Sequence, residues 1–422
     1  MNTLLRSQDY PLANQEFGID VNQLQVGFIS RKNTQSKAST EHIIWLEYLR
    51  IVCLQLFAIS VLLAVSYSVQ ANESFSLADS DTRLQLAALV DDEKRPQLFG
   101  DGKKISSSWA FAMDNDFLAP GHRDRDYTFG INLTYSGSNA EDASISLKAP
   151  LGVIDKLLGV DGLVAHPRNN HSVELGLFGF TPQELESEVI NENDRPYASL
   201  VYFSSSHERI DVEKNVAWNS TLTIGALGLG WVGDLQNEVH QQISARAARG
   251  WDNEISDGGE LTGRYVLARQ DYLESFSDSV ELKSTLQASV GYLTETSWGM
   301  SFRSGKIISP WASFNPDLIS YGEKSTYSNN VSSTNEHYVW AGFTLKARFY
   351  NAFLQGQFRD SDLSYDYSEL RPVIAEAWLG YTFAFKEGYR VSYVLRAQSS
   401  EIKRGDGDRS VVWGGLIFAT TI

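Results

Sequence analysis

Cysteine is almost absent from this sequence. The single cysteine among 422 residues is Cys53, and it lies inside an apolar run from Ile51 to Val69. If that run is an export signal, the mature chain contains no cysteine at all. Its absence excludes a disulfide scaffold, a cysteine nucleophile and a cysteine-ligated metal centre.

An excess of positive charge is also missing. The chain has 36 Lys and Arg against 52 Asp and Glu, a net charge of −16. Charged residues before Asn72 cancel, with five of each sign, so the negative excess belongs to the rest of the chain. This balance argues against a nucleic-acid partner, because nucleic-acid binding depends on Lys and Arg. Acidic groups could instead meet divalent cations.

Long hydrophobic runs are lacking after Ala71, since no unbroken apolar stretch there is long enough for a membrane-spanning helix. The one long run follows Arg50 and ends at Val69-Gln70-Ala71, with small residues where a signal peptidase cleaves. A single transmembrane anchor is the weaker alternative, because the run contains Gln55 and several serines. We therefore expect an N-terminal extension and signal peptide over residues 1–71, a polar lead-in over 72–107 and the fold over 108–422.

Two alternating runs flank a polar loop between Trp109 and Gly137. The second run places five apolar residues on one face, namely Tyr127, Phe129, Ile131, Leu133 and Tyr135, and small polar residues on the other. A period of two predicts a strand. In a soluble sandwich the apolar face would meet a second sheet, whereas in a membrane barrel it would meet lipid.

Similar segments recur along the chain, as expected of an antiparallel all-β protein. Besides the two strands of the opening hairpin, the candidates are His171–Thr181, Pro196–Ser206, Ala217–Ala226, Gly263–Tyr272, Val280–Ser289, Tyr292–Ser304, Tyr338–Phe349, Ala352–Arg359, Val373–Phe385, Tyr389–Gln398 and Val411–Ile422. That set gives 13 strands. Because bacterial single-chain barrels have an even number, we expect about 12 strands and one wrong candidate.

The later strands favour lipid as the partner of the apolar face. In Val373–Phe385 the apolar positions alternate with Glu376 and Thr382, over a length that crosses a bilayer at barrel tilt. Short joints such as Lys386-Glu387-Gly388 alternate with long polar stretches such as Gly305–His337, which we interpret as periplasmic turns and extracellular loops. One feature disagrees, because many such barrels end on an aromatic residue and this chain ends on Ile422. The sequence predicts a transmembrane antiparallel β-barrel in the bacterial outer membrane.

Polar side chains gather at one end of the opening hairpin. Asn115 and Asp116 end its first strand, and Thr128 begins its second. An amide, a carboxylate and a hydroxyl at one rim could hold a hard cation or orient a water molecule. The alternative is that Asn and Asp simply favour turns.

One segment has a helical rather than a strand pattern, Gly233–Arg249. Asp234 is a suitable N-cap, and Gln236 and His240 lie four residues apart and share a face. This is the one short helix that we expect, in an extracellular loop. It could carry a site, or it could be a surface helix with a solvated histidine.

Taken in order, these motifs resemble the LpxR-type family of outer-membrane lipid A 3′-O-deacylases. The matching motifs are Asn115-Asp116, Asp126-Tyr127-Thr128, Thr181-Pro182, Asp194-Arg195-Pro196-Tyr197-Ala198, Gln236-x3-His240 and Tyr350-Asn351-Ala352-Phe353-Leu354-Gln355-Gly356. The chain departs from the family pattern at Ser199, where glycine is expected, at Trp231-Val232-Gly233, where Gly-Pro is expected, and in the short loop Phe117–Arg125.

The resemblance implies a 12-stranded barrel with an active site between the wall and a helix near the outer leaflet, where an ester-linked acyl chain of lipid A is removed. It places Asn115, Asp116, Thr128 and His240 at essential positions and Gln236 at a nearby polar one. It also implies a Ca²⁺ ion held by Asp116 and Asn115. The partners would be lipopolysaccharide and the bilayer, with the protein acting as a monomer.

The residues themselves suit ester hydrolysis by water. No Gly-x-Ser-x-Gly elbow and no mature cysteine supplies a nucleophile, so His240 is the natural base for a water molecule. A non-catalytic barrel, either a pore or a structural protein, is the main alternative. A soluble β-sandwich that binds carbohydrate is a third.

Overall fold

The structure is a computed structural model that describes residues 107–421 apart from 122–124, 138, 244, 278, 322 and 324–334. The expected extension and signal peptide lie outside the described residues, as does the lead-in up to residue 106. Among the helices that are described, none has the length and apolar character needed to span a membrane.

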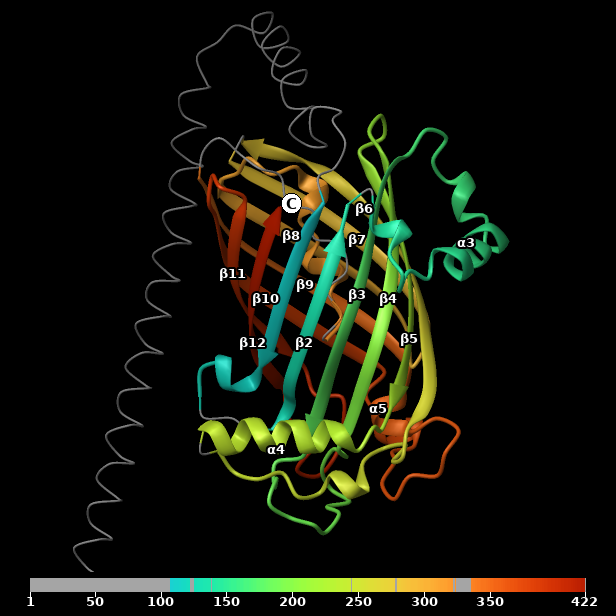
Figure 1. The fold of residues 1–422 in the computed structure, drawn as a ribbon, viewed down its shortest axis with the longest axis vertical. Helices are drawn as coiled ribbons and strands as arrows, with labels where there is room; N and C mark the ends of the chain where they lie inside the picture. The colour runs from blue at the N-terminus through green and yellow to red at the C-terminus, as the bar shows by residue number, and fades with distance from the viewer. Residues whose placement is uncertain are drawn as a thin grey trace, which may run out of the picture. The chain divides into compact units, whose positions relative to one another are not determined.

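Twelve antiparallel strands form one closed barrel, as the sequence predicted (Figure 1). Each strand pairs with its neighbours in sequence, and β1 closes the ring by pairing with β12. The strands are β1 Ser108–Asn115, β2 Asp126–Ser136, β3 Arg168–Thr181, β4 Ala198–Asp211, β5 Val216–Leu227, β6 Glu260–Ser277, β7 Val280–Gly291, β8 Leu293–Lys306, β9 Glu336–Asn351, β10 Val373–Ala384, β11 Tyr389–Gln398 and β12 Val411–Thr421. Closure leaves no unpaired strand edge exposed to lipid.

The wrong candidate strand is Ala352–Arg359, which begins as the short helix α5, Ala352–Gln355. The Asn351 side chain ends β9 by accepting a hydrogen bond from the Phe353 amide at 3.0 Å. Gln355 accepts from the Asn351 amide at 2.9 Å. This reciprocal capping turns the backbone into a helix where the side-chain pattern alone suggested continued alternation.

The alternation of side chains follows the prediction along most of the wall. Ile131 and Leu133 face outward, as do Val373 and Tyr381, whereas Glu376 is buried in the lumen. Tyr127 is a correction, because it is fully buried although it was placed on the apolar outer face. Asp126 has a φ of 71°, and a bulge lies between Tyr127 and Phe129. A bulge shifts the side-chain alternation by one residue, which turns Tyr127 inward.

The connections differ between the two ends of the barrel. At one end, five of the six connections are ten residues or longer, namely 116–125, 182–197, 228–259, 352–372 and 399–410, and the sixth is the single residue Tyr292. At the other end, three connections are short turns, 212–215, 278–279 and 385–388, and two are long, 137–167 and 307–335. Longer loops mark the extracellular end of such barrels. The stretch Gly305–His337 was therefore wrongly placed outside, since it lies at the same end as Lys386, whose amide donates to Asn335 at 3.0 Å.

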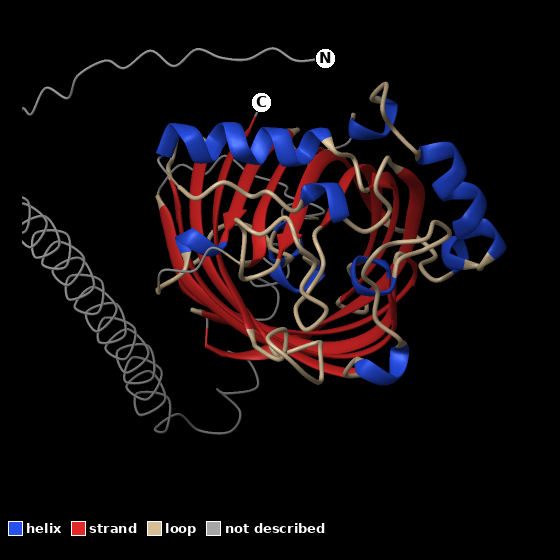
Figure 2. Cartoon of the chain, turned by 90° about the horizontal axis from the view of Figure 1, so that it is seen from below, coloured by secondary structure: helices blue, strands red, loops and turns tan. Residues whose placement is uncertain are grey.

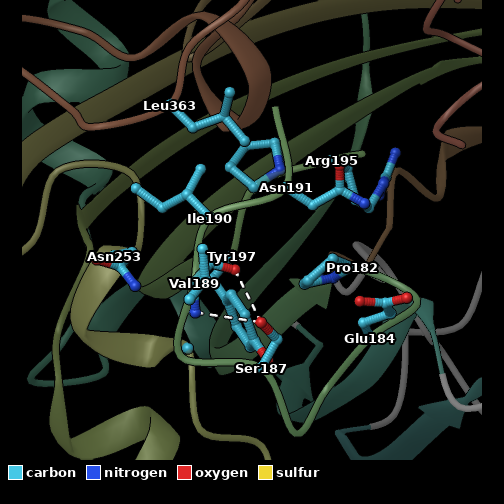
Figure 3. Close-up of a pocket in the computed structure, with 12 residues that line it drawn as sticks. Pro182, Glu184, Ser187, Val189, Ile190, Asn191, Arg195, Tyr197, Asn253 and Leu363 are labelled. Carbon is cyan, nitrogen blue, oxygen red and sulfur yellow. Dashed lines mark hydrogen bonds between the residues drawn. The ribbon is translucent and has the colours of Figure 1, made fainter. Parts of the chain in front are cut away.

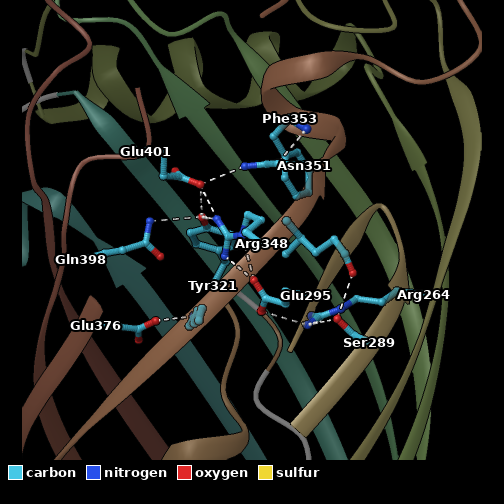
Figure 4. Close-up of polar contacts among 12 residues, drawn as sticks. Arg264, Ser289, Glu295, Tyr321, Arg348, Asn351, Phe353, Glu376, Gln398 and Glu401 are labelled. Carbon is cyan, nitrogen blue, oxygen red and sulfur yellow. Dashed lines mark hydrogen bonds and ion pairs between the residues drawn. The ribbon is translucent and has the colours of Figure 1, made fainter. Parts of the chain in front are cut away.

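Part of the β8–β9 connection fills the lumen. Trp311, Phe314 and Tyr321 are all buried, and Tyr321 joins an aromatic cluster with Tyr127 and Phe353. Charged side chains complete the filling (Figure 4): Arg348 bridges Glu295 at 2.7 Å and also contacts Glu401. The barrel therefore encloses a packed polar interior rather than an open channel.

The structure has more helix than the single short one expected. Helix α4, Trp231–Ile243, lies across the extracellular ends of the front strands. A second helix, α3, Lys148–Leu157, lies outside the wall (Figure 2). The sequence analysis assigned no element to residues 148–157, so α3 was not predicted.

Candidate active site

The β1–β2 corner is held together by the side chain of Asn115. Its Oδ1 accepts a hydrogen bond from the Phe117 amide at 2.6 Å and caps the short 3-10 helix Asp116–Leu118. Its Nδ2 donates to the Thr128 carbonyl at 2.5 Å. A carboxamide can accept and donate at once, which suits Asn to this position. The predicted neighbourhood of Asn115 and Thr128 is thus present.

Asp116 and Thr128 lie at the same corner, and both are buried. Asp116 Oδ2 accepts from the Arg125 amide at 2.5 Å, so the carboxylate closes the loop back toward β2. The Thr128 hydroxyl hydrogen bonds to the Thr181 hydroxyl at 2.5 Å. The bulge in β2 makes this contact, because Thr128 is the extra residue without a partner in the β3 register. Together these side chains place oxygen atoms at the extracellular rim.

Helix α4 presents its predicted polar face to the protein, although its limits differ from those expected. It begins at Trp231 and ends at Ile243, so Asp234 lies within the first turn and is not the N-cap. Val232, Gln236 and His240 are buried at a spacing of four residues. Gly233 faces Trp251, where a Cβ atom would lie 2.4 Å from the indole Cγ. Glycine at that position lets the helix seat directly on the ring.

Hydrogen bonds fix the orientation of Gln236. The indole Nε1 of Trp251 can only donate, and it lies 2.8 Å from Gln236 Oε1. The amide nitrogen of Gln236 therefore points the other way, to His240 Nε2 at 3.4 Å. Since that nitrogen donates, His240 Nε2 accepts and carries no proton.

The other ring nitrogen of His240 leads to the same tautomer. Nδ1 lies 2.5 Å from the Arg246 carbonyl oxygen, which can only accept, so Nδ1 carries the proton. Both partners thus favour the same tautomer, with the proton on Nδ1 and the lone pair on Nε2. The chain after α4 makes this contact because it folds back along the helix, where Asn237 pairs with the backbone of Ala248.

The two groups of predicted residues meet through an aromatic contact. Phe129, on the outer face of β2, lies 6.4 Å from the Trp251 ring, and Tyr197 lies 5.0 Å from the same ring. Trp251 in turn binds Gln236. The hairpin corner with Asn115, Asp116 and Thr128 and the helix with Gln236 and His240 are therefore parts of one extracellular cap over the β2–β4 end of the barrel.

A buried charge network next to the corner was missed as a functional element. Asp126 binds Arg409 at 2.9 Å and Arg195 at 3.4 Å. Arg409 also binds Asp194 at 2.7 Å, and Arg195 binds Glu401 at 3.0 Å. The motif around Asp194 and Arg195 was noticed, but nothing in the sequence pairs Asp126 with Arg409, 283 residues away. This network ties two extracellular connections, 182–197 and 399–410, to the start of β2.

A small pocket lies between these connections, beside Tyr197 and Arg195 (Figure 3). Its volume is about 30 Å³, enough for one or two water molecules. Tyr197 donates to the Leu185 carbonyl at 3.0 Å and closes one wall. The pocket is too small for an acyl chain, so a lipid would be met along the outer surface of the cap.

The oxygen donors at the hairpin corner are compatible with a hard cation. Asp116 supplies a carboxylate, and the Asn115 carbonyl oxygen accepts one hydrogen bond while keeping a second lone pair. Ca²⁺ takes six to eight such oxygens, from carboxylates, backbone carbonyls and water. Within the described part of the chain, no three His, Cys, Asp or Glu side chains cluster as a metal site. Backbone carbonyls and water would therefore have to complete the coordination.

Comparison with known proteins gives one family and a shared fold. The family profile described as outer membrane protein LpxR matches residues 57–422. The solved structure of LpxR from Salmonella typhimurium is 16% identical with a TM-score of 0.57, covering 75% of this chain and all of that one. The β domain of the Bordetella autotransporter BrkA is 7% identical with a TM-score of 0.35, covering 76% and 100%. A search of curated proteins finds no match.

Proposed function

The chain belongs to the LpxR family of outer-membrane proteins, and on that premise we propose that it is an esterase that removes an ester-linked acyl chain from lipid A. The 3′-acyloxyacyl group is the expected target. The observation that carries this proposal is the tautomer of His240: Nδ1 donates to the Arg246 carbonyl, and the unprotonated Nε2 can act as a base once a water molecule replaces the Gln236 amide, which lies 3.4 Å away. We expect the enzyme to act as a monomer.

The surface around the cap suits a lipid substrate. Helix α4 exposes Trp231, Leu235 and Val239 on the face opposite His240, each at least 40% accessible. Phe117, in the hairpin corner, is 74% exposed. Apolar side chains at this level of a barrel can lie among acyl chains of the outer leaflet. An ester close to the headgroups would then lie near both Asp116 and His240.

The reaction needs a base, an acid and stabilisation of the oxyanion. His240 Nε2 takes a proton from water as the water oxygen attacks the ester carbon, and the Nδ1 hydrogen bond to Arg246 holds the imidazolium in place. Collapse of the tetrahedral intermediate breaks the bond to the sugar oxygen, which receives the proton back from His240. The products are a free fatty acid and a sugar hydroxyl.

Asp116 and Asn115 are the residues that would hold Ca²⁺, as oxygen ligands at the corner of the hairpin. A bound cation there would supply positive charge for the ester carbonyl oxygen. Thr128 contributes by holding the corner, through its carbonyl to Asn115 and its hydroxyl to Thr181. These contacts keep the carboxylate of Asp116 close to β2. Thr128 thus has a positioning role and does not act as a nucleophile.

The packed lumen favours an enzyme over a pore. Buried ion pairs occupy the interior: Arg264 of β6 binds Glu323 of the β8–β9 connection at 3.0 Å, and Lys346 of β9 binds Glu376 of the adjacent strand β10 at 2.6 Å. An ion path would have to break several of them. Breaking a buried pair costs about 3–5 kcal/mol.

The test is the lipid A of a Gram-negative host that expresses the full chain. Mass spectrometry should show a loss corresponding to one acyl substituent, compared with cells carrying an empty vector. Tandem spectra should place the loss at the 3′ position. Unchanged lipid A, with the protein folded in the outer membrane, would contradict the deacylase proposal.

A further inference from the structure

A cavity of about 820 Å³ lies at the end of the barrel opposite the active site. It is formed by the β2–β3 connection, which carries α3, and by the outer faces of β3 and β4. Both ribbon views show α3 outside the ring of strands (Figures 1 and 2). The cavity therefore opens toward the membrane side of the wall at its periplasmic end.

The wall beneath α3 is polar where it would otherwise meet lipid. Glu208 points into the lumen, where it accepts from Asn170 at 3.2 Å, so its neighbour Arg209 points outward. Asp155 of α3 binds Arg209 at 2.6 Å and accepts from Tyr265 at 2.8 Å. The helix thus seals a charged patch on the outer wall and is held there by buried polar contacts.

The other side of this segment is apolar and exposed. Val153 is 60%, Leu157 81% and Leu158 61% accessible. A helix that lies along a membrane surface is stabilised there when its apolar residues enter the acyl region. We place α3 at the level of the headgroups in the periplasmic leaflet, with these three residues directed into the lipid.

The cavity between α3 and the wall contains groups of both charges. Lys148 binds Glu141 at 2.6 Å, and this hydrogen bond raises the pKa of Lys148 and lowers that of Glu141, so both are charged at neutral pH. His171 lies 3.6 Å from Glu141. The rings of His171 and His207 stack at 4.2 Å between centroids. Lys156, Asp161, Arg209 and the largely exposed Asp142 also line the cavity.

We propose that this cavity binds the headgroup of a zwitterionic phospholipid from the leaflet that faces the periplasm. The phosphate would lie against Lys148, Lys156 and the histidine pair, and the ammonium group against Glu141 and Asp142. The acyl chains would extend past Val153 and Leu157 into the bilayer. Because the lining carries both signs, a phosphoethanolamine headgroup matches it better than a purely anionic one. The site is independent of the esterase activity proposed above.

The experiment is native mass spectrometry of the detergent-solubilised protein titrated with phosphatidylethanolamine. We expect a saturable phospholipid adduct, and at least a tenfold loss of apparent affinity in the double variant Lys148→Glu/Lys156→Glu. Lys386→Glu is the control, since it makes the same type of substitution, once, in the periplasmic turn 385–388, away from the cavity. It should alter affinity less than twofold. Both lysines of the double variant are exposed, so folding should survive.

A second measurement locates the lipid. A phosphatidylethanolamine with a photoreactive acyl chain should label the peptide that contains residues 148–158 in the wild type and much less in Leu157→Asp. Equal affinity of the double variant and the wild type would overturn the proposal. So would equal weakening by Lys386→Glu, labelling spread evenly around the barrel, or tighter binding of phosphatidylglycerol than of phosphatidylethanolamine.

Discussion

The tautomer of His240 is determined by two groups whose hydrogen-bonding roles are fixed. An indole nitrogen always donates and a backbone carbonyl always accepts. The Trp251 indole fixes the orientation of the Gln236 amide, and the Arg246 carbonyl accepts from Nδ1. Together they determine which ring nitrogen of His240 carries the proton. Such fixed partners are an effective way to hold a base ready, because no competing proton position is satisfied equally well.

Replacing His240 by Asn tests the base. The variant keeps similar size and hydrogen-bonding capacity but loses basicity, so the deacylation rate should fall at least ~100-fold, the lower end of what general-base catalysis contributes. The measurement is the rate of fatty-acid release from purified lipid A. Heat-modifiable mobility should stay normal, because His240 lies on α4 and the substitution leaves the barrel strands unchanged.

His166→Asn is the control, since His166 is an exposed residue at the opposite end of the barrel. Its rate should equal that of the wild type. Near-normal deacylation by His240→Asn would remove His240 from the role of base.

Asp116→Ala tests the carboxylate at the hairpin corner. Activity should fall by more than ~100-fold if the carboxylate holds a cation that stabilises the oxyanion, a contribution of about 3–4 kcal/mol. Chelation of the wild type with EDTA should have the same effect, and added Ca²⁺ should restore activity to the wild type alone.

Asp360→Ala serves as the comparison, because Asp360 is an exposed carboxylate in an extracellular connection. It should remain active and calcium-responsive. Full wild-type activity after dialysis into excess EDTA would exclude calcium from the mechanism.

At the scale of elements, the position of α4 is set by its contact with Trp251. Gly233 allows the helix to approach the ring, and Asn237 clamps the returning chain. The proposed base His240 and its neighbour Gln236 are therefore positioned by a helix that is not part of the barrel. A small shift of α4 would move His240 relative to the hairpin corner while leaving the strands unchanged.

Gly233→Ala should reduce activity about tenfold or more, because the new methyl group would push α4 away from Trp251 and a misplacement of ~1 Å can cost up to ~100-fold. Alanine is intrinsically the better helix former by about 0.5–1 kcal/mol, so any loss reflects packing. The readout is kcat for lipid A.

Gly230→Ala is matched to it, since a Cβ at Gly230 meets nothing within 4 Å. This variant should be as active as the wild type. If the two alanine variants behaved alike, the contact between Gly233 and Trp251 would not be what positions the helix.

Glu254, in the connection after α4, makes the stability of the protein depend on pH. Burial raises its pKa to about 8, although the hydroxyl of Ser199 donates to it at 2.9 Å and acts in the opposite direction. Below pH ~4.5 both folded and unfolded carboxyls are protonated. As pH rises from there to about 8, only the unfolded form ionises, so stability is lost across that window, on the order of 4 kcal/mol in total.

Glu254→Gln should remove this loss. Its free energy of unfolding in urea, compared with that of the wild type, should improve steadily from pH 5 to pH 8 and then level off. Glu238→Gln, on the exposed side of α4, should show no such trend. A constant difference between Glu254→Gln and the wild type at all pH values would contradict the assignment.

At the scale of the whole molecule, the barrel is polar inside and apolar outside. Its interior is filled by part of the β8–β9 connection and by ion pairs, and its outer band carries Ile131, Leu133 and Phe418. This inversion relative to a soluble protein is what the bilayer requires. The barrel also separates the two proposed sites, with the cap that carries His240 at the extracellular end and α3 at the periplasmic end.

Leu133→Arg tests the outer band. Leu133 is 43% exposed and pairs with Phe111 on β1, so the arginine would face lipid and should cost about 2–4 kcal/mol near the midplane. Unfolding from lipid vesicles in urea measures this. Val189→Arg, in the extracellular connection 182–197 and 80% exposed, should change stability by less than ~0.5 kcal/mol. Equal costs at the two positions would contradict the membrane orientation.

The sequence by itself determined the features that repeat over short distances. Alternation identified the twelve strands together with one false candidate, Ala352–Arg359, and gave the lipid-facing side of most of the wall. The spacing of Gln236 and His240 identified one face of a helix. The corner residues Asn115 and Thr128 were also predictable, because a hairpin brings its two strand ends together. These features depend on backbone geometry, which acts between neighbours.

Only the tertiary structure decided the contacts between distant segments. It turned Tyr127 inward at a bulge, folded 307–323 into the lumen and placed Trp251 against Gln236. It also paired Asp126 with Arg409 and set α3 against the wall at Arg209. Each of these contacts depends on which side chains fill the same space after the barrel closes, and closure joins residues hundreds of positions apart that no local period connects.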